Sequence, residues 1–242
     1  YIVTDGERDW AKAKVKEYCL PSEKENIFLV GVQMRSNEKR RTWPEEHVKK
    51  LIQLLTEDKN TRVVVFNWEQ KKISLPQVFN FGESLPYTAA MVEQCDVIVA
   101  PDSAILHVAG ALQKKTVAIF GPVPPESRVN HYQNTTAMVA GLPCQYCWYR
   151  PTCGHNQTCL SEISPEAVAK AVWEKKDEEE KVRKVLSINT GKGTGFRPDD
   201  VVLVKRNHGG FGDIMMTLPG VEALKEKYPS KKIYYALPKK FA

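Results

Sequence analysis

The sequence predicts an α/β fold in which a parallel sheet carries helices on both faces. Short apolar runs alternate along the chain with segments of helical periodicity, which is the pattern of repeated βαβ units. These runs are continuously apolar instead of alternating, and this is typical of parallel strands buried on both faces. A content of 42% hydrophobic and 26% charged residues also fits a globular protein.

The first part of the chain contains four expected strands and five expected helices. The strands share an apolar, β-branched composition and span residues 27–32, 62–67, 95–100 and 116–120. The helices have one apolar face or consist of small residues, and they span residues 5–18, 44–55, 87–94, 105–112 and 164–173. Pro44 suits a first helical turn because its missing N–H needs no partner there.

The segment after the third strand is the most informative. Pro101 ends the expected strand 95–100, and Asp102 and Ser103 are residue types that cap the start of a helix. Backbone N–H groups at such a helix start, just beyond the carboxyl end of a parallel strand, form an anion site. The pattern therefore predicts a site for a nucleotide diphosphate.

The second part of the chain begins with a charged and then glycine-rich stretch. Residues 174–185 are almost wholly charged, which is typical of a solvated helix or linker, and residues 189–198 lack the spacing of a Walker A phosphate loop. A new βαβ pattern follows, with strands at 201–205 and 232–237 and a helix at 213–228. We therefore expect a domain at 1–175, a linker at 176–199 and a single βαβ unit at 200–242, which the resemblance described below implies is the incomplete start of another Rossmann-like domain. Two strands and one helix cannot bury both faces of their own sheet.

Charge and hydropathy narrow the classes of partner. The formal net charge of +6 favours acidic partners such as phosphates or anionic lipid surfaces, and it is too diffuse to indicate nucleic acid. No apolar run approaches the roughly 20 residues that span a bilayer, and the sequence does not open with the pattern of a signal peptide. These features predict a cytoplasmic protein, with the inner face of the membrane as a further expected place of action.

Two segments of the sequence resemble glycosyltransferase family 9, the ADP-heptose:lipopolysaccharide heptosyltransferase group. KRRTWPEEHVKKLIQLL together with APDSAILHVAGALQKKTVAIFGPVPPE resembles the donor-binding domain of that family. VVLVKRNHGGFGDIMMTLPGVEALKEKYPSKKIYYALPKKFA resembles the start of its acceptor-binding domain. The resemblance covers residues 1–172 and 200–242 and implies a bacterial enzyme with the GT-B architecture of two Rossmann-like domains.

The order of the two segments is reversed relative to that family, whose acceptor domain precedes the donor domain. The sequence leaves two explanations open, a fragment of a tandem protein with two such modules or a permuted or engineered chain. In either case most of one acceptor domain is missing, so this chain alone is expected to be incomplete.

On the acceptor side, the resemblance implies that Asp213 is the catalytic general base, in a loop that includes Gly210 and Gly212. An aspartate in a glycine-rich turn can approach a substrate closely, because little side-chain bulk intervenes. A structural alternative is that Asp213 only caps the helix that follows it.

On the donor side, the resemblance implies binding residues in two loops: Arg40, Arg41, Asp102, Ser103, Ala104 and His107. Arginine suits this role because a guanidinium can clamp a diphosphate and stabilise the leaving group; the alternative is a solvated basic loop. Ala104 replaces the usual glycine, and its methyl group disfavours the positive φ that a glycine would allow next to a phosphate. His107 either binds the donor or satisfies a buried polar neighbour, and Trp43 is expected in the core instead of against adenine.

Four cysteines with the spacing C-x2-C-x5-C-x5-C are candidate ligands of a structural zinc or iron ion: Cys144, Cys147, Cys153 and Cys159. Free or redox-labile thiols are an open alternative, and disulfides are disfavoured where no secretion signal is present. Cys19 and Cys95 are expected to be ordinary buried thiols.

Taken with the resemblance, these features imply a glycosyltransferase that moves a heptose-like sugar from an ADP-sugar to a hydroxyl of lipopolysaccharide core or a related glycan, with inversion. The expected partners are the nucleotide-sugar donor, a glycan or glycolipid acceptor, a membrane surface and a second copy of the chain. No metal is needed for the chemistry if basic side chains and the helix start neutralise the phosphates. The alternatives are a non-catalytic nucleotide-sugar-binding or structural module, and a GT-B enzyme that uses a UDP-sugar.

Overall fold

The computed structural model describes residues 3–18, 27–33, 35–66, 72–148, 153, 158–190, 201–205 and 232–236. The chain divides into two compact units, Tyr1–Lys181 and Val182–Ala242, and each is described by itself.

The first unit is built on one six-stranded sheet in which every pair of neighbouring strands is parallel, in the order β3-β2-β1-β4-β5-β6. The strands are β1 (Phe28–Gln33), β2 (Thr61–Phe66), β3 (Val78–Phe81), β4 (Val97–Pro101), β5 (Lys115–Ile119) and β6 (Thr135–Met138). The chain moves outward from β1 to β3 and then returns to the other side of β1 at β4. The strand order therefore reverses between β1 and β4, as in the Rossmann fold.

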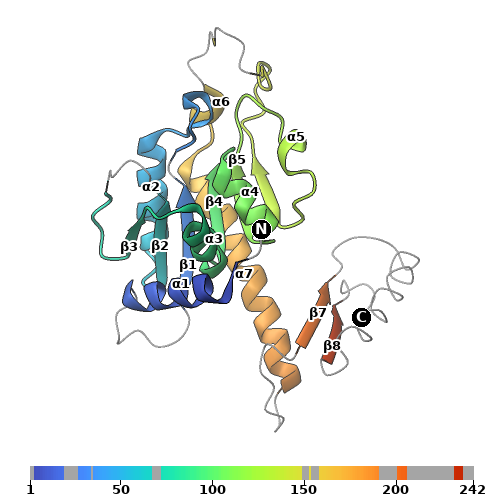
Figure 1. Cartoon of the computed structure of the whole chain (residues 1–242). Helices are drawn as coiled ribbons and strands as arrows, with labels where there is room; N and C mark the ends of the chain where they lie inside the picture. Colours follow the sequence, from blue (N-terminus) through green and yellow to red (C-terminus); the bar gives the residue numbers. More distant parts are fainter. Residues whose placement is uncertain are drawn as a thin grey trace, which may run out of the picture. The chain divides into compact units, whose positions relative to one another are not determined.

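Helices cover both faces of this sheet (Figure 1). They are α1 (Asp5–Tyr18), the 3₁₀ turn η1 (Lys39–Arg41), α2 (Glu45–Thr56), α3 (Leu85–Gln94), α4 (Ala104–Ala111), α5 (Glu126–Val129), α6 (Thr158–Ser161) and α7 (Pro165–Thr190). Alternate strand residues belong to two separate hydrophobic cores, because successive side chains of a strand point to opposite faces. Val30 packs with α2 and the first turns of α7, whereas Leu29 packs with α1, α3 and α4.

Trp43 belongs to the core formed with α2 and α7, as the sequence predicted. Its side chain is 2% exposed, and its indole N–H donates to the carbonyl of Ile163 at 3.1 Å. This hydrogen bond satisfies the polar end of a large buried ring. Cys95 is also buried, and Cys19 lies outside the described residues.

The four predicted strands of this unit are confirmed within two residues at each end, but the edge strands β3 and β6 were not predicted. Their sequences, VFNF and TTAM, are short and mostly half-buried, so they lack the continuous apolar signal of the inner strands. The expected strand 95–100 starts two residues late because Cys95 ends α3, with its N–H donating to the carbonyl of Val92. Helix α7 continues through the charged run as far as Thr190.

The second unit contains two described strands, β7 (Val201–Lys205) and β8 (Lys232–Ala236), which pair in parallel. A parallel pair is what the βαβ pattern of the sequence predicts. The helix expected at 213–228 lies outside the described residues. Among the described helices of either unit, none is both long enough and apolar enough to cross a bilayer.

Candidate functional site

A cavity of about 560 Å³ opens at the carboxyl ends of β1 and β4. Its walls come from the loop after β1, from η1, from the start of α3 and from the turn into α4, and its polar lining includes Gln33, Arg35, Ser36, Asn37, Arg41, Asp102, Ser103 and His107. The crevice outside the carboxyl ends of the strands, where the strand order reverses, is the usual ligand site of open α/β sheets. The volume also suits a ligand of nucleotide size.

Asp102 is the charged centre of this cavity. The residue is 3% exposed, and its carboxylate Oδ2 lies 3.3 Å from Arg41 Nη1 and 3.4 Å from Arg128 Nε. The other carboxylate oxygen, Oδ1, lies 3.9 Å from His107 Nε2. Ser36 donates its hydroxyl to the backbone carbonyl of Asp102 at 3.1 Å, which ties the loop after β1 to the turn after β4.

Helix α4 begins at this cavity without a side-chain cap. Ser103 occupies the N-cap position with an extended backbone, as the sequence predicted, but its side chain makes no capping hydrogen bond. Within the described part of the chain, the buried hydroxyl of Ser103 and the buried Oε1 of Gln33 have no hydrogen-bond partner. Uncapped N–H groups at a helix start attract anions, so this end of the cavity is suited to phosphate.

Ala104 is the first residue of α4. Among described residues other than glycine, positive φ values occur at Gln113, Tyr146 and Trp148, so Ala104 has an ordinary helical backbone. A methyl group therefore imposes no backbone strain here, because alanine is disfavoured only where φ is positive.

Two of the predicted basic residues are adjacent but placed differently. Arg41 lines the cavity and donates to Asp102. Arg40 donates from Nε to Glu38 Oε1 at 3.1 Å, and this contact lowers the pKa of the Glu38 carboxyl. The structure thus joins Arg41 to the turn at Asp102 and Arg40 to Glu38 within its own loop.

Two residues of this site were missed by the sequence reasoning, and both come from the segment between β5 and β6. Arg128 on α5 pairs with Asp102, and the hydroxyl of Tyr132 lies 3.0 Å from His107 Nδ1. Neither residue sits in a motif or a periodic pattern. No local sequence pattern could have predicted these two residues, because the segment between β5 and β6 comes next to α4 only through tertiary packing.

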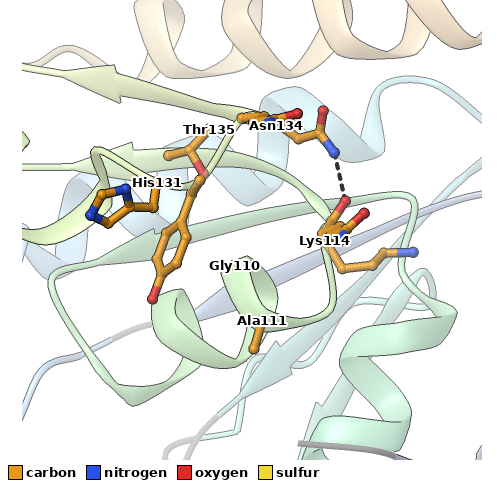
Figure 2. A pocket seen from close by; sticks show the side chains of 9 residues that line it. Gly110, Ala111, Lys114, His131, Asn134 and Thr135 are labelled. Carbon is orange, nitrogen blue, oxygen red and sulfur yellow. Dashed lines mark hydrogen bonds between the residues drawn. The ribbon is translucent and has the colours of Figure 1, made fainter. Parts of the chain in front are cut away.

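A second cavity, of about 260 Å³, lies at the opposite end of the sheet, where β5 and β6 begin. Figure 2 shows it between Gly110 and Ala111 of α4 on one side and, on the other, His131 and Asn134 of the loop before β6 with Thr135 at the start of that strand. The amide of Asn134 donates to the carbonyl of Gln113 at 2.7 Å. This end of a parallel sheet is not where the ligands of such folds usually bind, so the larger of these two cavities is the candidate ligand site.

The predicted cysteine cluster lies on the loop after β6 and at α6. Burial raises the pKa of the Cys159 thiol, and its electrostatic interaction with Cys153, Cys147 and Cys144 raises it further. Cys144, Cys147 and Cys159 are free thiols. In the part of the chain that the structure describes, no three His, Cys, Asp or Glu side chains are arranged to hold a metal ion.

The acceptor-side residues Asp213, Gly210 and Gly212 lie outside the described residues. Their roles stay predictions from the sequence.

Comparison with known proteins gives consistent matches. The sequence model of glycosyltransferase family 9 (heptosyltransferase) matches residues 7–155. Lipooligosaccharide heptosyltransferase 2 of Campylobacter jejuni is 29% identical over 80 residues, which are 32% of this chain and 25% of the relative.

Two solved structures share the fold. The E. coli ADP-heptose lps heptosyltransferase II is 20% identical, with a TM-score of 0.58 over 74% of this chain and 54% of that chain. The dodecameric iron-containing heptosyltransferase TibC, solved with ADP-D-β-D-heptose, is 14% identical, with a TM-score of 0.53 over 67% of this chain and 48% of that chain. The chain thus spans about half the length of these structures and a quarter of the curated relative.

The predicted Rossmann-like sheet of GT-B type is therefore confirmed, since the strand order and the structural neighbours agree. The family match extends over more than half of the sequence and includes the basic loop, the turn at Asp102 and the start of α4. The chain belongs to glycosyltransferase family 9, the heptosyltransferases.

Proposed function

We propose that the Rossmann-like unit at 1–175 binds the diphosphate of an ADP-sugar. The protein of which it is part would then transfer a heptose-like sugar to a hydroxyl of lipopolysaccharide core or a related glycan. The ADP-heptose named for the E. coli and TibC structures supports this choice of donor.

One observation carries the proposal. The cavity at the strand-order reversal combines the uncapped start of α4 with the guanidinium of Arg41. Both supply N–H donors and positive charge to one small volume, which is what a diphosphate requires. The unpartnered Ser103 hydroxyl and Gln33 Oε1 are further polar groups within the described site that a bound donor could satisfy.

The proposed reaction is a single displacement with inversion. Asp213 takes the proton of the acceptor hydroxyl while the oxygen forms a bond to the anomeric carbon of the donor sugar. The bond between that carbon and the diphosphate oxygen breaks, and ADP leaves with the electron pair. Arg41, with Arg40 beside it in the sequence, and the start of α4 neutralise the charge that develops on the diphosphate, so the step requires no metal.

Calorimetric titration of the chain with ADP, UDP and GDP tests the donor site. We expect selective binding of ADP that weakens by about 10- to 100-fold in Arg41→Ala, because a hydrogen bond to a charged group contributes about 1.5–3 kcal/mol. Lys12→Ala is the matched control, since Lys12 is an exposed cation on α1 with only a 4.0 Å contact to Asp9. Equal weakening in both variants, or no nucleotide binding in the wild type, would contradict the donor site.

The general base is tested separately, in a protein that carries a complete acceptor domain. Asp213→Ala should abolish sugar transfer and leave the affinity for ADP unchanged, because Asp213 acts on the acceptor. Transfer that survives this substitution would show that another group removes the proton.

The reversed order of the two segments favours a second candidate, a nucleotide-sugar-binding module without its own catalysis. This candidate predicts undiminished ADP binding with no transfer to any lipopolysaccharide or glycan acceptor. Transfer that depends on Asp213 would exclude it.

We further propose that Cys144, Cys147, Cys153 and Cys159 hold a structural zinc or iron ion. Their spacing supports this, as do the positive φ values of Tyr146 (69°) and Trp148 (50°) in and just after the C-x2-C turn. Bulky residues rarely adopt such a backbone unless another constraint holds it. Metal analysis should find about one ion per chain, and Cys147→Ser should lower both the metal content and the melting temperature. A metal-free protein with an unchanged melting temperature in Cys147→Ser would contradict this proposal.

The remaining proposed partners are a membrane surface and further copies of the chain. The net charge of +6 supports binding to anionic vesicles, and the dodecameric state named for TibC supports self-association. Vesicle flotation in low and high salt and light scattering after size exclusion test these two proposals.

A further inference from the structure

We propose that Tyr132 is a positioning residue for the donor site: its hydroxyl sets the tautomer and the orientation of His107. The inference rests on the proposed binding of an ADP-sugar in the cavity at Asp102. It adds a residue from outside that cavity to the machinery that holds the donor.

The contacts of His107 on its two sides support this role. Nδ1 lies 3.0 Å from the hydroxyl of Tyr132, and Nε2 lies 3.9 Å from Oδ1 of Asp102. An ionised carboxylate only accepts hydrogen bonds, so the hydrogen of a neutral imidazole is favoured on Nε2. Nδ1 is then the acceptor, and the tyrosine hydroxyl donates to it. The N–H of His107 is thereby held on the side of Asp102 and the cavity.

An imidazole as exposed as that of His107, 45% for its side chain, needs such a partner to keep one orientation. A solvent-exposed ring samples several rotamers, and ordering it on ligand binding costs free energy. A ring already held by Tyr132 avoids much of that cost.

Tyr132 itself is fixed by its surroundings. Its backbone N–H donates to the carbonyl of Val129 at the end of α5, and its carbonyl accepts from the N–H of Thr135 at the start of β6. The two rings meet edge to face, with 6.0 Å between their centroids and 69° between their planes. The same short segment also delivers Arg128 to Asp102. It therefore contacts both members of the Asp102–His107 pair.

Gly110 makes this approach of Tyr132 to α4 possible. It lies three residues after His107 and thus on the same face of the helix. A Cβ atom at this position would come within 2.5 Å of the Tyr132 ring. Glycine is the least favourable helix residue other than proline, and here its lack of a side chain is what admits the ring.

Imidazole ¹⁵N spectra of the ligand-free chain test whether the Tyr132 hydroxyl sets the tautomer of His107. The chain has five histidines, and the signals of His107 are assigned by their loss in His107→Gln. Tyr132→Phe keeps the ring against Gly110 and removes only the hydroxyl. We expect the His107 signals to move toward the tautomer mixture of a free imidazole, and Gly110→Ala to move them in the same direction. Unchanged His107 signals in Tyr132→Phe would overturn the inference.

ADP titration of the same variants tests whether this contact strengthens the binding of the donor. We expect Tyr132→Phe to raise the Kd for ADP by about 3- to 10-fold, the range that corresponds to loss of one neutral hydrogen bond. The effects of Gly110→Ala and Tyr132→Phe should be less than additive, because both act through the same contact. Tyr18→Phe is the control: its ring stacks on Phe79 at 3.3 Å, in another part of the unit. It should change neither the Kd nor the His107 signals.

The outcomes separate this inference from the proposed function. Altered His107 signals with an unchanged Kd, in a chain that binds ADP, would overturn the positioning role and leave the proposed function standing. A wild-type chain that binds no nucleotide would refute the proposed function and with it the effect on donor binding. The ¹⁵N spectra would still decide whether Tyr132 sets the imidazole.

Discussion

Replacing Asp102 by asparagine should have opposite effects on stability and on ADP binding. The substitution keeps the size of a side chain that is 3% exposed and removes its negative charge. It breaks two ion pairs, of 3.3 Å to Arg41 and 3.4 Å to Arg128. The side chains of Arg41 and Arg128 are 27% and 35% exposed, so water solvates part of their positive charge when the carboxylate is lost.

The expected loss in the free energy of unfolding is about 1–3 kcal/mol. Breaking a fully buried pair costs about 3–5 kcal/mol and breaking an exposed pair about 0–1 kcal/mol, and this site lies between these limits. The affinity for ADP should move the other way. At an effective dielectric constant of about 20, two unit charges about 6 Å apart interact by about 3 kcal/mol. With part of that screened by water, we expect the Kd for ADP to fall by about 3- to 10-fold in Asp102→Asn.

Urea denaturation and calorimetry on one preparation measure both quantities. An ADP-sugar should gain less affinity than ADP if the Asp102 carboxylate also accepts hydrogen bonds from the sugar hydroxyls. Arg41→Ala serves as the comparison, since it removes a cation from the same pair and should weaken ADP binding. An unchanged stability or a weaker binding of ADP in Asp102→Asn would show that the Asp102 carboxylate does not compete with a diphosphate for the two arginines.

Three further predictions concern stability and reactivity. Lys176→Met should cost about 1 kcal/mol at pH 7 by removing the 2.6 Å pair with Asp58, as measured by urea denaturation. Burial raises the pKa of the Asp58 carboxyl, but its hydrogen bonds, that from Lys176 being the largest, outweigh burial and lower the pKa below 3.8. The difference in the free energy of unfolding between wild type and Lys176→Met should therefore be full above pH 3.8 and shrink as the pH falls through the lowered pKa. Burial raises the pKa of the Cys95 thiol from 9.0 to about 12, so at pH 8 its reactive thiolate is roughly 1000-fold scarcer than that of an ordinary thiol. After treatment with an alkylating reagent, mass spectrometry should find the exposed Cys144 modified in the native protein and Cys95 modified only in denaturant. Trp43→Phe should lower the free energy of unfolding by about 1–3 kcal/mol, because it leaves a buried carbonyl without its indole donor; an unchanged urea midpoint would contradict this.

The inner strands of the sheet could be predicted because they are buried on both faces. Strands β1, β2, β4 and β5 carry continuous apolar runs, and such runs between helical segments have few alternative structures. The edge strands β3 and β6 carry no such run, and each has a described strand partner on one side only. Their pairing depends on the neighbouring strand, which a local pattern does not report.

The turn at Asp102 was predicted in position but not in detail. Asp102 and Ser103 are residue types that cap helices, and the sequence predicted that their side chains would do so. In the structure the carboxylate of Asp102 faces Arg41 and Arg128, and Ser103 leaves α4 uncapped. The choice between local capping and a distant arginine depends on tertiary packing, so no residue pattern decides it.

The absence of a side-chain N-cap on α4 is itself informative about the site. A missing N-cap costs a helix about 1 kcal/mol, and a buried hydroxyl without a partner adds to that cost. Natural sequences accept such local conflicts mainly where function requires them. At the start of α4 the conflict leaves the backbone N–H groups beside the cavity without a side-chain cap and, among the described residues, the buried Ser103 hydroxyl without a partner, while Asp102 is bound by two arginines. If a diphosphate satisfies these groups, ADP should raise the melting temperature of the chain, and Ser103→Ala should reduce that increase while destabilising the ligand-free protein little. A Ser103→Ala variant with the full ADP-induced increase would show that the hydroxyl does not contact the ligand.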